Sequence, residues 1–139
     1  MHMQLRKIVL ADDDAEDQTI IQDAMDLLNG PDVLLFVDNG EQVMGLLESK
    51  FSDGITPCLI VLDLNMPKMN GTQTLSRLKQ DERFKEIPVI IYSTSINPAE
   101  KEKCLELGAH SYITKPVSFK ESIATAKTFL QFCQPENTG

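Results

Sequence analysis

The chain has 139 residues, 42% of them hydrophobic, and a formal net charge of −8. That length suits one globular domain with a single core and is short for two. The acidic balance, without clustered Lys and Arg, argues against direct nucleic-acid binding. No apolar run approaches the roughly 20 residues of a membrane helix. The N-terminus also lacks a secretory signal, so we expect a cytoplasmic protein without membrane insertion.

Short apolar runs alternate with amphipathic segments along the whole chain. The expected strands are residues 7–11, 33–37, 58–62, 89–92 and 111–114. A helical pattern follows each strand, beginning near Ala15, after Asn39, after Gly71, at Asn97-Pro98 and at Ser118. Alternation of this kind, with short connections, predicts an α/β fold: a doubly wound parallel sheet with helices on both faces.

Polar residues mark where the helices should begin. Asp14 is expected to cap the first helix, with Asp17 three residues on. Asn39 should cap the second while Gln42 answers it, and Ser118 begins a capping box for the last helix. The tail over residues 134–139 is expected to be disordered.

Two features of the chain allow more than one interpretation. Phe119 lies on one apolar stripe of the last helix, with Phe129 at its margin and Phe132 well off it. The pattern fits either a wide core face or a frayed end, or else a homodimer or partner contact through these rings. The odd number of cysteines, without metal-ligand spacing, favours reduced and packed thiols.

Unusual polar residues gather at the ends of the expected strands. Asp12 and Asp13 follow the first strand, Asp63 the third, Ser93 the fourth and Lys115 the fifth. In open α/β sheets, ligands bind at the carboxyl ends of the strands, where strand order reverses. If the first, third, fourth and fifth strands are neighbours, these side chains converge on one depression.

Several carboxylates in one pocket need a compensating cation, and Mg²⁺ is the simplest choice for oxygen ligands. The expected ligands are Asp12, Asp13, Asp63 and the backbone carbonyl of Asn65. Carboxylates are nucleophiles toward phosphoryl groups, so Asp63 is the candidate phosphoacceptor. Phosphoryl transfer depends mostly on positioning and charge neutralisation, which Lys115 can assist. The Ser93 hydroxyl would donate to a further phosphoryl oxygen.

Four segments in this order and spacing resemble the receiver domain of bacterial two-component response regulators. They are the acidic turn at 9–14, residues 61–71 around Asp63, residues 89–93, and residues 108–116 around Lys115. The likeness covers about residues 5–133. It implies a flavodoxin-like receiver fold with five helices and strand order 2-1-3-4-5.

The resemblance also implies roles for individual residues. Asp63 would be phosphorylated by a sensor histidine kinase or a histidine phosphotransfer protein, with Asp12 and Asp13 as the acidic magnesium pair. Ser93 and Tyr112 match the switch pair of the family, and Lys115-Pro116 matches a bond that is cis in it. Receivers are phosphoacceptors, with at most slow self-catalysed phosphotransfer and autodephosphorylation, and are not enzymes in the usual sense.

Details of the sequence point to a subfamily. The Ser93-Thr94-Ser95 run and residues 78–88 look similar to stand-alone regulators paired with phytochrome-type histidine kinases. Thr94 stands where alanine or glycine is usual, so Thr94 and Ser95 are candidate modulators of access to the phosphoryl group. Output is expected through contact with an unknown downstream protein or through phosphoryl relay.

Other functions fit parts of the pattern. A magnesium-dependent aspartyl phosphatase would carry a second aspartate two residues after the nucleophile, where this chain has Asn65. A flavodoxin-like electron carrier needs a hydroxyl-rich phosphate loop, where this chain has acids. A phosphorylation-independent scaffold receiver would not need the complete set of site residues.

Overall fold

The computed structural model describes residues 3–51 and 54–133. Its elements are β1 (Met3–Ala11), α1 (Ala15–Leu27), β2 (Leu34–Val37), α2 (Gly40–Lys50), β3 (Ile55–Leu62), α3 (Gly71–Gln80), β4 (Val89–Ser93), α4 (Pro98–Glu106), β5 (Ser111–Thr114) and α5 (Phe119–Gln131). The five strands form one parallel sheet in the order β2-β1-β3-β4-β5. The predicted fold class and strand order are therefore confirmed.

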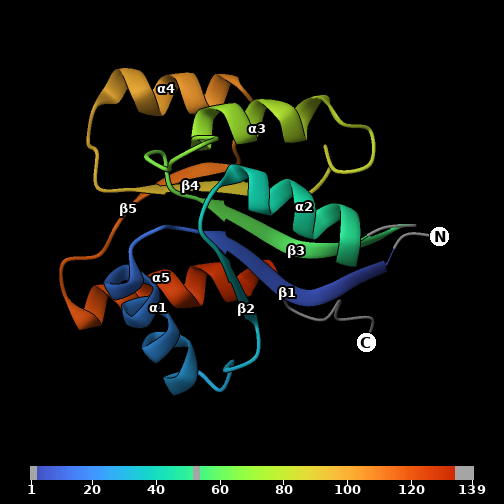
Figure 1. The fold of residues 1–139 in the computed structure, drawn as a ribbon. Coiled ribbons are helices and arrows are strands. Elements are labelled where there is room, and N and C mark those ends of the chain that lie inside the picture. Colours follow the sequence, from blue (N-terminus) through green and yellow to red (C-terminus); the bar gives the residue numbers. More distant parts are fainter. Residues whose placement is uncertain (1–2, 52–53, 134–139) are drawn as a thin grey trace.

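The sheet separates two helical layers, as Figure 1 shows: α1 and α5 cover one face, and α2, α3 and α4 cover the other. Successive residues of a strand point to opposite faces. In β1, Ile8 and Leu10 accordingly join the core under α1 and α5, while Val9 and Ala11 join the other core. Within the described ranges, no helix has the length and apolarity to cross a membrane.

Two central strands are longer than their apolar runs. β1 begins at Met3 and β3 at Ile55, and these starting residues pair with each other. Parallel backbone hydrogen bonding continues the ladder through polar residues such as Gln4 and Thr56. Hydrophobicity does not record this pairing, so the sequence pattern placed both strand starts too late.

The predicted caps are confirmed, but the side chains expected to bond back to the cap residue bond to the residue before it. Asp14, Asn39, Asn97 and Ser118 each accept a backbone hydrogen bond at a helix start. The Gln42 amide oxygen, however, accepts from the backbone N–H of Asp38, one residue before the cap. Glu121 likewise accepts from Val117. A full capping box, not among the predicted caps, joins Asn70 and Gln73 at the start of α3.

The aromatic rings of α5 are distributed differently from the predicted stripe. Phe129 is fully buried and packs edge-on against Tyr92, with ring centroids 5.6 Å apart. Burial of such a side chain contributes about 1.5–3 kcal/mol to stability. Phe132 is half-buried and packs edge-on against His110, whereas Phe119 is 49% exposed. A homodimer contact through this helix stays a prediction, and the predicted disordered tail, residues 134–139, lies outside the described residues.

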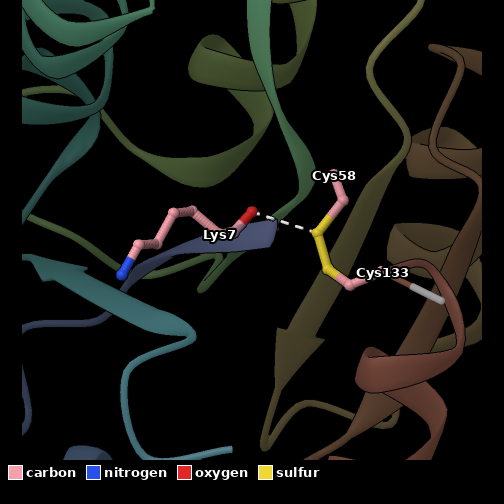
Figure 2. The surroundings of a disulfide bond; sticks show 3 residues. All are labelled: Lys7, Cys58 and Cys133. Atoms are coloured by element: carbon pink, nitrogen blue, oxygen red, sulfur yellow. Dashed lines mark hydrogen bonds between the residues drawn. A yellow bond between two sulfur atoms is a disulfide. The ribbon is translucent and has the colours of Figure 1, made fainter. Parts of the chain in front are cut away.

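Two of the three cysteines are paired, so the prediction of three reduced thiols is wrong for this structure. Cys58 in β3 and Cys133 after α5 form a disulfide with their Cα atoms 5.3 Å apart (Figure 2). Their sequence separation of 75 residues carries no pairing signal; the docking of α5 on the sheet brings them together. The Cys58 sulfur also lies 3.1 Å from the Lys7 carbonyl oxygen. Only a reduced thiol could donate a hydrogen there, because a disulfide sulfur carries none. Cys104 is free and buried, as expected.

The disulfide predicts a thiol count. Protein purified without reductant and alkylated in denaturant should take up label at Cys104 alone, because Cys58 and Cys133 are bonded to each other. The same protein treated with reductant first should take up label at all three. Intact mass measures both. Label at all three positions before reduction would show that the two buried sulfurs are unbonded neighbours.

Candidate functional site

Five of the predicted site residues meet at the carboxyl edge of the sheet. Asp12 and Asp13 follow β1, Asp63 follows β3, Ser93 ends β4 and Lys115 follows β5. β1 and β3 are neighbours, and their arrowheads lie side by side in Figure 1. The strand order reverses between β1 and β3, because β2 is added on one side of β1 and the later strands on the other. Ligands bind at such a reversal point in open α/β sheets. The backbone N–H of Asp63 donates to the Ala11 carbonyl, which ties the two strand ends together (3.0 Å).

The Lys115 ammonium is the centre of the site. Its Nζ lies 2.8 Å from Asp12 Oδ2, 2.8 Å from Asp17 Oδ2 and 3.0 Å from Asp63 Oδ2. Burial alone would lower the pKa of Lys115, but the close contacts with the carboxylates of Asp12 and Asp17 outweigh burial and hold that pKa above its usual range. The side chain is therefore a permanent cation at neutral pH. It offsets only part of the negative charge around it.

Asp12 carries the least compensated atom of the site. The residue is fully buried, and its Oδ1 accepts from the backbone N–H of Asp14 at 2.9 Å. Its Oδ2, despite the Lys115 ammonium 2.8 Å away, has no hydrogen-bond partner of good geometry among the described residues. Burial raises the pKa of Asp12, and Lys115 opposes that shift. A buried carboxylate oxygen of this kind gains from a further cation.

The donor set fits a hard divalent cation. Carboxylate oxygens of Asp12, Asp13 and Asp63 all lie within 4.8 Å of one another. Asp13 is exposed, whereas the other two are buried, so one side of the cluster is open to solvent. Mg²⁺ prefers oxygen ligands and keeps several waters. Asn65 is exposed, and its backbone N–H donates to Asp63 Oδ1 at 3.3 Å; its carbonyl as a ligand stays a prediction.

The predicted switch residues are linked through Ser95. Ser93 is fully buried, and its Oγ accepts from the backbone N–H of Ser95 at 3.1 Å. The Tyr112 hydroxyl donates to the Ser95 carbonyl at 2.9 Å. The hydroxyl at the end of β4 and the ring on β5 thus contact the same residue. Thr94, which lies between Ser93 and Ser95 in the chain, is exposed.

Two residues of the site were not recognised in the sequence. The sequence predicts Asp17 as part of the cap of α1, and its backbone N–H does donate to Asp14 Oδ1, but its carboxylate binds Lys115. The Tyr92 ring lies under the ammonium, 5.7 Å from Nζ to the ring centroid. Asp17 could have been noticed in the sequence, because Asp14 alone caps α1 and a further acid in the first turn is not needed for the cap. Tyr92 gave none, because its apolar neighbours make it look like ordinary core.

One backbone detail differs from the family resemblance. The Lys115–Pro116 bond is trans, so the cis bond implied by the resemblance is wrong for this structure. Trans is the intrinsically favoured isomer even before proline, by about 0.5–1 kcal/mol. The backbone N–H of Lys115 donates to the Ser93 carbonyl at 2.9 Å, and this bond fixes the start of the loop.

The fold and the site together define an α/β receiver with an acidic, lysine-bearing pocket. Residues 8–127 match the model of the response regulator receiver domain family. The chain therefore belongs to this family of two-component signalling proteins, whose members are generally phosphoacceptors. The predicted family resemblance is confirmed.

Proteins similar to this chain include phytochrome response regulators. The structure of the phosphorylated cyanobacterial phytochrome response regulator RcpA superposes with a TM-score of 0.79 at 31% identity, covering 95% of this chain and 94% of that one. Response regulator Rcp1 of Synechocystis is 30% identical over 82% of this chain and 79% of its own length. The Mn(2+)-bound form of Rcp1 superposes with a TM-score of 0.76 at 28% identity, covering 94% and 96% of the two chains.

Longer regulators match as well. The transcriptional regulatory protein CpxR of Klebsiella pneumoniae is 34% identical over 91% of this chain. The chain spans half the length of CpxR. The common part is the receiver domain, so this match supports the family and carries no activity of the rest of CpxR.

Gly71 provides a test of how tightly the loop after Asp63 is held. A Cβ there would collide with the Asp63 carbonyl oxygen and the Leu64 Cα. We expect Gly71→Ala to lower the free energy of unfolding by about 2 kcal/mol. Gly45, inside α2, has nothing within 4 Å of its added Cβ. Gly45→Ala should instead raise stability by about 0.5–1 kcal/mol. Urea denaturation measures both, and a Gly71→Ala protein as stable as wild type would contradict the close approach.

Proposed function

We propose that Asp63 is the phosphoacceptor of a magnesium-dependent two-component switch, in a receiver domain over residues 5–133. The observation that carries this proposal is the Lys115 ammonium, 3.0 Å from Asp63 Oδ2, at the point where strand order reverses. An acid at a strand end that faces a buried permanent cation can receive a phosphoryl group with its charge already partly neutralised.

The chemistry assigns one task to each side chain. An Asp63 carboxylate oxygen forms the bond to phosphorus while the bond from phosphorus to the donor nitrogen or acyl oxygen breaks, and the electron pair leaves with the donor. Lys115 pairs with one phosphoryl oxygen, and the Ser93 hydroxyl donates to another. Asp12, Asp13, Asp63 and the Asn65 carbonyl would hold Mg²⁺, which neutralises phosphoryl charge when bound.

The readout begins at Ser93. Ser93 Oγ accepts from the Ser95 N–H, and the Tyr112 hydroxyl donates to the Ser95 carbonyl. If the Ser93 hydroxyl moves to donate to a phosphoryl oxygen, we expect Ser95 and Tyr112 to move with it. α4 begins three residues after Ser95 and buries only Cys104 among its residues. Such a lightly packed helix can shift at small cost. We assign output to this region, through contact with a downstream protein or through phosphoryl relay.

A sensor histidine kinase or a histidine phosphotransfer protein is the proposed phosphodonor, in the cytoplasm. Exposed apolar side chains follow both members of the Asp17–Lys115 ion pair closely in the sequence: Ile20 is 40% exposed on α1, and Val117 and Phe119 are 91% and 49% exposed after β5. Apolar groups around a polar pocket are typical of a protein docking site. The similarity to phytochrome response regulators supports a donor of the phytochrome-kinase type.

Phosphorylation can be tested directly. Incubation with acetyl phosphate and Mg²⁺ should give one phosphoryl adduct by intact mass, because Asp63 is the nucleophile. Asp63→Asn should abolish it, whereas Asp23→Asn, at an exposed acid of α1, should not. Removal of Mg²⁺ with a chelator should abolish it as well. An adduct that persists in Asp63→Asn would overturn the assignment, and lack of any adduct on the wild type would favour a scaffold receiver.

Thr94 sets access to the phosphoryl group in this proposal. Thr94 directly follows Ser93 in the chain, and its side chain is exposed; we propose that it restricts the approach of water to the phosphoryl group. We expect Thr94→Ala to dephosphorylate several-fold faster, because a smaller side chain admits water more easily. Thr128→Ala, in α5, serves as the control. Loss of the phosphoryl adduct over time measures the rates, and equal rates for Thr94→Ala and wild type would remove this role.

A further inference from the structure

Asp17 is a carboxylate at the site that the proposed chemistry does not use. It lies in the first turn of α1, its side chain is 28% exposed, and its Oδ2 is 2.8 Å from Lys115 Nζ. It is not one of the three acids grouped closely enough to hold a cation. Its carboxylate therefore contacts the ammonium without belonging to the candidate metal cluster.

The oxygens of Asp12 and Asp63 show why a separate partner matters. In each residue Oδ1 accepts a backbone N–H, from Asp14 and Asn65 respectively. In each residue Oδ2 faces the Lys115 ammonium. The two Oδ2 oxygens, which accept no backbone N–H, are thus the ones that contact the Lys115 ammonium. A divalent cation that binds this cluster must compete with Lys115 for them.

We propose that Asp17 is a positioning residue: it holds the Lys115 ammonium while Asp12 and Asp63 engage a divalent cation. The contact needed for this is already formed, so Lys115 has only to give up two of its three carboxylates. Held on Asp17, the ammonium stays beside Asp63, where it can pair with a phosphoryl oxygen. This inference rests on the proposed function and adds a regulator of cation binding to it.

The burial of Lys115 separates this role from an ordinary surface ion pair. Lys115 is buried, so its contact with Asp17 is less screened than an exposed pair. Acids in a first helical turn also interact favourably with the helix dipole, which gives Asp17 a purely local reason to be there. Glu16 in the same turn shares that local effect and is exposed, without a side-chain contact to Lys115. Glu16→Gln is therefore a matched control for loss of one negative charge.

The test is Mg²⁺ affinity without any phosphodonor, measured by NMR titration of backbone amides. Four variants are compared with wild type: Asp17→Asn, Glu16→Gln, Lys115→Met and the double variant Asp17→Asn/Lys115→Met. We expect Asp17→Asn to weaken Mg²⁺ binding about five-fold, within the range for directly coupled neighbours, and Glu16→Gln to weaken it less than about two-fold. Lys115→Met should tighten binding, because the ammonium no longer competes.

The double variant decides whether Asp17 acts through Lys115. With Lys115 absent, Asp17→Asn should cost no more than Glu16→Gln, because no ammonium is left to position. An equal loss in both backgrounds, or unchanged or tighter binding in Asp17→Asn alone, would overturn the inference. Mg²⁺ binding with the expected pattern but no phosphoryl adduct on Asp63 would overturn the proposed function alone. No Mg²⁺ binding by wild type would overturn both.

Discussion

The site depends on one buried ammonium ion surrounded by carboxylates. Asp12 and Asp63 lie at adjacent strand ends, largely out of water, where two negative charges repel strongly. Leaving such charges uncompensated costs several kcal/mol each, so Lys115 makes the pocket compatible with a folded chain. It offsets one charge among several, and the remainder makes the pocket attractive to a divalent cation. Stability of the fold and chemistry of the site thus rest on the same contact.

Sheet topology supplies the geometry for that contact. Lys115 lies 52 residues from Asp63 in sequence and 98 from Asp17, yet all three side chains meet. The parallel order places every strand end at one edge, and Gly71 lets the next helix begin close against the loop that follows Asp63. The local backbone conformation and the long-range strand pairing therefore both determine where Asp63 lies. The link from Ser93 through Ser95 to Tyr112 extends this geometry toward α4.

Local sequence patterns were sufficient to predict much of the fold and of the site. Short apolar runs, cap residues such as Asp14 and Asn97, and the acids at strand ends each depend on a few neighbouring residues. These features predicted the fold class and the elements, and the order of four motifs predicted the family. The strand-end position of Asp63 and Lys115 was sufficient to bring them together, because parallel strands share one carboxyl edge.

Tertiary structure alone decided the rest. The Cys58–Cys133 bond and the Asp17–Lys115 ion pair join residues whose separation in the chain carries no signal. Helical spacing places Phe129 only at the margin of the apolar stripe of α5. Phe129 belongs to the core because the docked helix packs its ring against Tyr92. Periodicity reports which face of an element is apolar, whereas the partner across the interface depends on how elements dock. Sequence thus determined that a charged pocket would form, and docking of α1 and α5 decided which groups complete it.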